Sequence, residues 1–111
     1  MLFRSYKQAI EELQKVLAIN AKDKNALMAI AKSYFQIGDL DRATTSYLVA
    51  SNLDPSDAEP IFEVAKIYVE RGKIDQALIQ FERVLGLNKK YPKANFFIGR
   101  VMILKIGRAH V

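Results

Sequence analysis

The sequence predicts an all-α protein, an α-solenoid in which antiparallel helix pairs recur with a 34-residue period. Three observations support this prediction. Small residues recur at that interval, as at Gly38 and Gly72 or at Ala43 and Ala77. Apolar residues within each interval follow the i, i+3, i+4, i+7 spacing of a helix buried along one side. A helix pair of this kind buries only part of its surface, so stacked neighbours must supply the rest of the core.

The first two helices are predicted over residues 4–20 and from Asn25 to Ile37. The first segment places Ala9 one period before Ala43, so it corresponds to the second helix of a pair that lacks its first. In the next segment, one helical face collects the apolar residues Leu27, Ile30, Ala31 and Tyr34. Gly38 then stands where a helix commonly ends in the left-handed conformation.

The remaining turns follow from capping residues. Asp39 is expected to cap the next helix, which Asp54 and Pro55 end because proline cannot continue a helix and disfavours helical angles before it. Ser56 to Glu59 forms a capping box for the following helix. Pro60 is tolerated in its first turn, where backbone amides have no partner within the helix.

The repeat register divides the chain into segments at 1–23 (a second helix alone), 24–57 and 58–91 (two full repeats) and 92–105 (a first helix alone). At Arg4, Lys89 and Asn95 the residue type differs from the one that the repeat pattern predicts at that position. Because both outer segments are half-repeats, we expect the natural protein to be longer. The same reasoning predicts that apolar residues at the two ends lack neighbours, namely Leu13, Val16, Leu17, Phe97, Val101 and Met102.

Residues 106–111 are expected to be a non-native tail. The next turn glycine is due at position 106, but Gly107 arrives one residue late. The last six residues also resemble the translation of a common sequencing-library adapter. We therefore leave them out of the functional interpretation, which lowers the net charge from +5 to +4 because Arg108 is removed.

The composition argues against catalysis. The chain has no cysteine, and its one histidine is His110, inside the suspect tail. A disulfide framework, a thiolate nucleophile and a zinc site of Cys and His ligands are therefore excluded. A Ser-His-Asp arrangement would depend on that terminal histidine. We expect no enzymatic activity, no cofactor and no metal.

The charge pattern gives little support to a nucleic-acid or membrane partner. Lysines and arginines number 17 and acidic residues 12, and both signs are scattered along the chain. A nucleic-acid binder usually concentrates its positive charge on one face. No stretch approaches the roughly 20 apolar residues that span a bilayer, and residues 1–5 have no signal-peptide core. These features marginally favour a cytoplasmic location.

The spacing resembles that of the tetratricopeptide repeat family. From Leu27 to Pro55 the chain shows a small residue and a tyrosine in the first helix, a glycine turn, alanine and an aromatic residue in the second helix, and a closing Asp-Pro. Ile61 to Leu87 carry most of the same pattern. The resemblance implies that the first helix of each pair lines a concave groove in which partner peptides bind.

Two series of residues in the first helices could line such a groove. Met28, Phe62 and Phe96 form an apolar series; Lys32, Lys66 and Arg100 form a cationic one, four residues further along each helix. The complete set of candidate groove residues is Asn25, Met28, Lys32, Phe35, Glu59, Phe62, Glu63, Lys66, Val69, Glu70, Phe96, Arg100 and Ile103. Alternatively, the phenylalanines pack between helices, and Lys66 pairs with Glu63 and Glu70.

These observations predict a protein-interaction scaffold that binds a partner peptide or subunit, with no small-molecule substrate. One alternative is an accessory region of a larger enzyme or of a secretion or assembly protein. Another is an RNA-binding helical repeat, which the 34-residue period and the acidic Glu59, Glu63 and Glu70 disfavour. Some members of the family clamp a chaperone's C-terminal carboxylate with Lys and Asn, but the corresponding positions here do not support that clamp.

Overall fold

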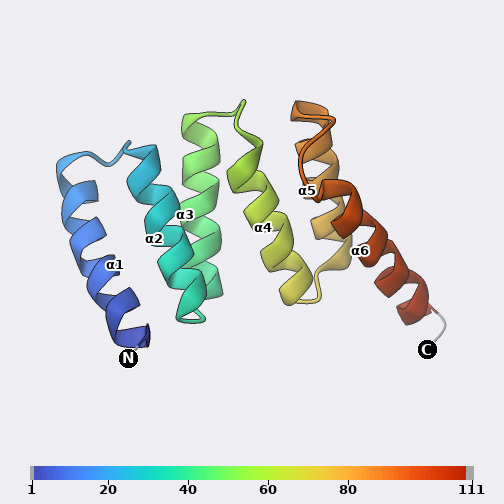
Figure 1. Ribbon diagram of the computed structural model, residues 1–111, viewed down its shortest axis with the longest axis horizontal. Coiled ribbons are helices and arrows are strands. Elements are labelled where there is room, and N and C mark those ends of the chain that lie inside the picture. Colours follow the sequence, from blue (N-terminus) through green and yellow to red (C-terminus); the bar gives the residue numbers. More distant parts are fainter. Residues whose placement is uncertain (1, 110–111) are drawn as a thin grey trace. The chain divides into compact units, whose positions relative to one another are not determined.

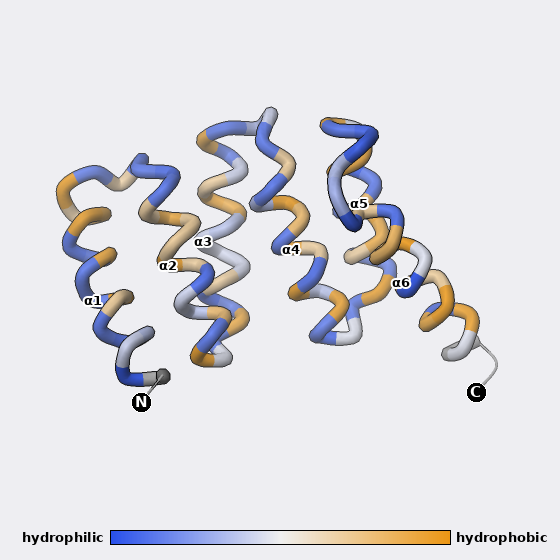
Figure 2. The backbone as a smooth tube through the Cα atoms, viewed as in Figure 1, coloured by the Kyte–Doolittle hydropathy of each residue, from blue (hydrophilic) through white to orange (hydrophobic). Residues whose placement is uncertain are grey.

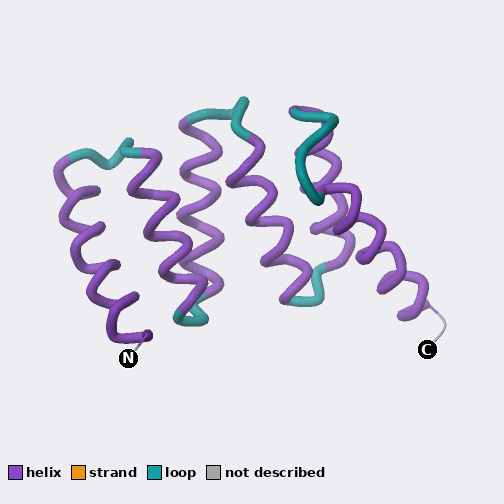
Figure 3. The backbone as a smooth tube through the Cα atoms, in the orientation of Figure 1, coloured by secondary structure: helices purple, strands orange, loops and turns teal. Residues whose placement is uncertain are grey.

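The computed structural model describes the backbone of residues 2–109. Its elements are α1 (Leu2–Ile19), α2 (Lys24–Gln36), α3 (Leu40–Leu53), α4 (Ala58–Glu70), α5 (Ile74–Leu87) and α6 (Ala94–Ala109) (Figure 1). Short loops join them, and no strand occurs within this range (Figure 3). The predicted class, an all-α helical repeat, is confirmed.

The chain divides into two compact units, Met1–Pro55 with α1 to α3 and Ser56–Val111 with α4 to α6. Each unit combines one complete helix pair with one further helix. We call α2, α4 and α6 first-type helices and α1, α3 and α5 second-type helices, after their place in the repeat. The repeat boundaries at 23/24, 57/58, 91/92 and 105/106 remain predictions.

In the first unit, α2 packs against both α1 and α3. The turn between α2 and α3 depends on Gly38, whose φ is 85°, a conformation that costs glycine little. The Gly38 N–H donates to the Phe35 carbonyl and the Asp39 N–H to the Tyr34 carbonyl, at 3.0 and 2.9 Å. Asp39 also accepts a hydrogen bond from the Arg42 N–H at 3.1 Å, so the predicted turn and cap are confirmed.

Small residues lie at the centre of each helix pair. Ala31 of α2 and Ala43 of α3 are fully buried, as are Ala65 of α4 and Ala77 of α5. A methyl side chain lets two antiparallel helices approach closely, and larger residues fill the space beside it. This explains why the repeat keeps alanine at these positions.

In the second unit, α5 packs against both α4 and α6. Gly72 has a φ of 73° and ends α4 in the same way as Gly38 ends α2. The cap of α4 differs from the prediction: Asp57, not Ser56, precedes the helix and accepts a hydrogen bond from the Glu59 N–H at 3.0 Å. The reason is that Asp57 itself has extended backbone angles, so the helix begins one residue later.

The last helix also differs from the prediction at both ends. It begins at Ala94 rather than at 92, because Lys93 has a φ of 66° and stands outside the helix. It then continues past Lys105 to Ala109, so the backbone shows no boundary where the non-native tail was expected to begin. His110 lies outside the described residues.

The expectation that the outer helices lack neighbours is only partly right. Val101 is fully buried, and Phe97 is half-buried because its ring stacks on Phe81 of α5 with centroids 5.7 Å apart. Met102, in contrast, is exposed. In α1 the exposed member is Val16, whereas Leu13 and Leu17 are half-buried. Each outer helix is thus covered on the side of its neighbour within the unit and open on another side.

Candidate functional site

The candidate groove residues belong to both units, with α2 contributing those of the first unit and α4 and α6 those of the second. On α2, Asn25 and Lys32 are exposed, and Met28 and Phe35 are half-buried. Their spacing of three and four residues places them on one face of the helix. Lys32 forms no ion pair with any residue between 2 and 109. This face therefore offers two apolar side chains beside an unpaired cation.

Phe62 of α4 is a core residue rather than an open groove residue. It is only 6% exposed. Its ring lies 5.7 Å from Phe81, 4.9 Å from Tyr91 and 5.5 Å from Phe97, measured between centroids. Aromatic pairs in edge-on or tilted arrangements at such distances stabilise a core. The packing alternative therefore describes Phe62.

Phe96 of α6 occupies the same register position as Phe62 but is 60% exposed. The Arg100 guanidinium lies over its ring, with the carbon 5.7 Å from the centroid, which is within the range of a cation–π contact. Within the described part of the chain Arg100 has no acidic partner. Ile103 is exposed one turn further along. This face of α6 combines a large apolar surface with an unpaired cation.

Lys66 differs from the other two members of the cationic series. Its Nζ lies 3.2 Å from Glu63 Oε2 and 5.0 Å from the centroid of the Phe62 ring. The ion pair with Glu63 is the one that the packing alternative predicts. Beyond Lys66 on α4, Val69 is half-buried and Glu70 is exposed. A ligand would have to compete with Glu63 for this cation.

Tyr91, in the loop between α5 and α6, was not among the predicted site residues. Burial raises the pKa of the Tyr91 phenol, and the negative charges of Glu59, Glu63 and Asp57 raise it further. The ring also covers Phe62, as described above. A sequence signal existed, since Tyr91 is the one aromatic residue in the otherwise polar segment 88–93.

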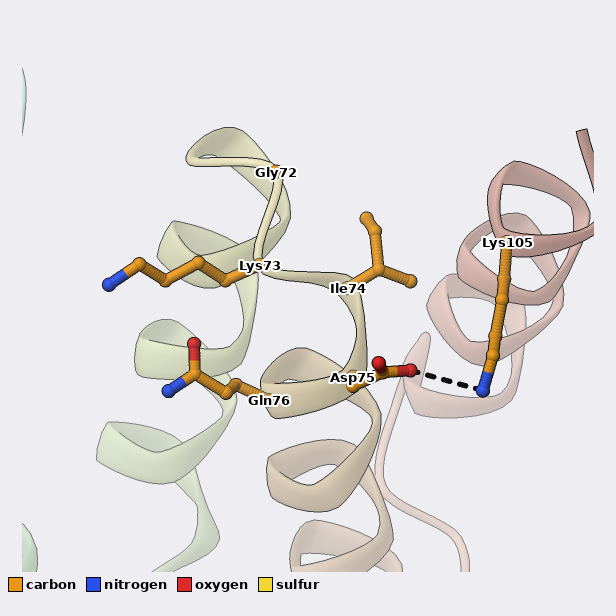
Figure 4. A pocket seen from close by; sticks show the side chains of 6 residues that line it. All are labelled: Gly72, Lys73, Ile74, Asp75, Gln76 and Lys105. Carbon is orange, nitrogen blue, oxygen red and sulfur yellow. Dashed lines mark ion pairs between the residues drawn. The ribbon is translucent and has the colours of Figure 1, made fainter. Parts of the chain in front are cut away.

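The second unit also contains a shallow hollow of about 370 Å³ between the start of α5 and the end of α6 (Figure 4). It is lined by Gly72, Lys73, Ile74, Asp75, Gln76 and Lys105. Lys105 Nζ and Asp75 Oδ1 are 3.0 Å apart, so the charges of this pair offset each other. The hollow is therefore a polar surface.

Within residues 2–109, no group of His, Cys, Asp and Glu has an arrangement suited to a metal ion. No helix in this range is long and apolar enough to cross a membrane.

The fold and these surfaces define a helical-repeat protein, and family comparisons make the class specific. Models described as tetratricopeptide repeat match residues 3–61, more than half of the chain, and residues 58–91. The chain belongs to the tetratricopeptide repeat family, as the residue pattern predicts.

The chain is similar to segments of much longer proteins. It is 27% identical over 99 residues to Superkiller complex protein 3 of Mus musculus, covering 89% of this chain and 6% of that protein. It is also 27% identical over 94 residues to the mouse outer dynein arm-docking complex subunit 4, covering 85% of this chain and 15% of that protein. The chain thus spans a small fraction of these relatives.

Solved structures share the fold at lower identity. The type III secretion chaperone SycD of Yersinia enterocolitica, in complex with a peptide of the translocator YopD, superposes with a TM-score of 0.84 at 16% identity. That match covers 91% of this chain and 82% of SycD. The first tetratricopeptide repeat domain of Spaghetti, bound to an HSP90 peptide, gives a TM-score of 0.84 at 19% identity, covering 92% of this chain and 81% of that one.

Proposed function

We propose that this chain is a protein-interaction scaffold that binds a peptide segment of a partner on its first-type helices and catalyses no reaction. The observation that carries the proposal is the pair of Phe96 and Arg100, an exposed aromatic ring beneath a guanidinium without an acidic partner in the described chain. The ring of Phe96 touches Phe97 edge-on, with centroids 5.7 Å apart, yet most of its surface stays exposed beside the exposed Ile103. A binding surface uses such adjoining apolar residues as anchors.

The side chains on this face of α6 indicate which kind of peptide it can bind. Phe96 and Ile103 offer apolar surface, and Arg100 between them can pair with a carboxylate. On α2, Met28 and Lys32 offer the same combination two repeat periods earlier in the sequence. We infer that the partner segment carries a large apolar residue close to an aspartate or glutamate, as in other peptide-in-groove recognition.

The comparisons support a peptide as the ligand class. SycD and the Spaghetti domain, which share this fold, are each described as bound to a peptide. The composition supports the absence of catalysis, because the chain has no cysteine and its one histidine is His110. The charge pattern supports protein over RNA, because Glu59 and Glu63 lie on α4 beside the cations and would repel phosphates.

The test uses the purified chain and a displayed library of random peptides. We expect selected peptides to share an apolar residue next to an acidic one, and Arg100→Glu to weaken their binding about tenfold, measured by fluorescence anisotropy. Arg83→Glu, on the exposed side of α5, makes the same change in net charge and should leave affinity unchanged. Equal losses in both variants would show that net charge, not the α6 surface, attracts the peptides.

A further inference from the structure

The two first-type helices of the second unit, α4 and α6, differ in charge. α4 contains three glutamates and one lysine, a net charge of −2, whereas α6 contains no acidic residue and is largely apolar (Figure 2). The difference falls at equivalent positions of the repeat, because Lys93, directly before α6, lies one period after Glu59 of α4. The charge of Lys66 is offset by Glu63. Glu59, Lys93 and Arg100, in contrast, form no ion pair with any residue between 2 and 109.

The two cations lie at positions that stay exposed even in a helix with neighbours on both sides. In the first unit, α1 and α3 both pack against α2. On that helix Asn25, two periods before Lys93, is exposed, and so is Lys32, two periods before Arg100. The exposure of Lys93 and Arg100 is therefore a property of the repeat, and both side chains are accessible to a ligand.

Tyr91 and Phe97 form an aromatic surface between α4 and α6. Both rings pack on Phe62 of α4, with centroids 4.9 and 5.5 Å away, and both are half-buried. The Tyr91 phenol forms no hydrogen bond within residues 2–109, where no buried side-chain oxygen lacks a partner, so its oxygen reaches solvent. Burial raises the pKa of this phenol, and the charge of Glu59 raises it further. The Glu59 carboxylate therefore lies close enough to Tyr91 for its field to act there.

A ligand that crosses this aromatic surface meets a negative charge on the α4 side and positive charges on the α6 side. We propose that the partner segment carries both signs: a lysine or arginine beside Tyr91 that pairs with Glu59, and an aspartate or glutamate that pairs with Arg100. Its apolar residue lies between the two. This inference rests on the proposed function and adds the basic residue, which fixes the direction in which the segment binds. A reversed segment would bring like charges together at both ends, which lowers affinity.

The test uses peptides selected on the purified chain from a displayed random library. We expect them to carry a basic residue on the opposite side of the apolar residue from the acidic one. Glu59→Lys should weaken their binding about fivefold in fluorescence anisotropy, because an attraction between exposed charges becomes a repulsion. A peptide whose basic residue is replaced by glutamate should bind the Glu59→Lys chain better than the unchanged chain. Circular dichroism should show equal helicity in both chains.

Glu82→Lys is the matched control, because Glu82 is exposed on α5 and the substitution makes the same change in net charge. It should leave affinity unchanged, and equal losses in the two variants would overturn the proposal. The proposal is also overturned, while peptide binding stands, if Arg100→Glu weakens binding and Glu59→Lys does not. A chain that selects no peptide, or an Arg100→Glu variant that binds as well as the unchanged chain, would overturn this inference together with the proposed function.

Discussion

Replacing Ala77 by leucine probes the close approach of α4 and α5. Ala77 is fully buried in a cluster that also contains Ala65 and Phe81. Leucine adds three carbon atoms, whose burial would stabilise the fold by about 2 kcal/mol if space existed. At a site with no free surface the added atoms instead push the helices apart. Overpacking of this kind lowers the free energy of unfolding by ~1–3 kcal/mol net.

The assay is urea unfolding followed by far-ultraviolet circular dichroism, with thermal unfolding alongside. The expected loss corresponds to a decrease in Tm of about 4–12 °C for a chain of this size. Gln76→Leu is the matched control, because the Gln76 side chain is exposed and lies one residue away on the same helix. This substitution should change the free energy of unfolding by less than about 0.5 kcal/mol. If Ala77→Leu were as stable as Gln76→Leu, the argument for close packing through small residues would be refuted.

Two further predictions concern a cap and a titration. Asp39→Ala should lower the free energy of unfolding by about 1 kcal/mol, because the Arg42 N–H loses its acceptor. Asp39→Asn keeps an acceptor oxygen and should retain most of this stability, so equal losses in the two variants would contradict the assignment of Asp39 as the helix cap. The raised pKa of Tyr91 means that the folded chain keeps the phenolic proton at a pH where the unfolded chain loses it. Stability should therefore be complete below about pH 10 and decrease above it. Unfolding measured against pH should lose this decrease in Tyr91→Phe, and an unchanged slope would show that Tyr91 is not its source.

Part of the candidate surface was predictable and part was not. The sequence places Lys32 and Arg100 on first-type helices, and both are exposed; each directly follows a small residue of the repeat and so points about 100° away from it around the helix. It misses Tyr91, which lies in a loop and belongs to no periodic pattern. It also places Phe62 and Phe96 in one series, although the first is buried and the second is exposed.

The sequence by itself determined the helix pairs, their turns and their close contacts. These depend on local chemistry: left-handed glycine at Gly38 and Gly72, a carboxylate cap at Asp39, and alanine where two helices meet. The tertiary structure decided which equivalent positions are covered. Phe62 is buried because Phe81, Tyr91 and Phe97 surround it, whereas Phe96 has no such enclosure. Periodicity fixes the direction in which a side chain points along its helix, but burial depends on what packs there from elsewhere in the chain.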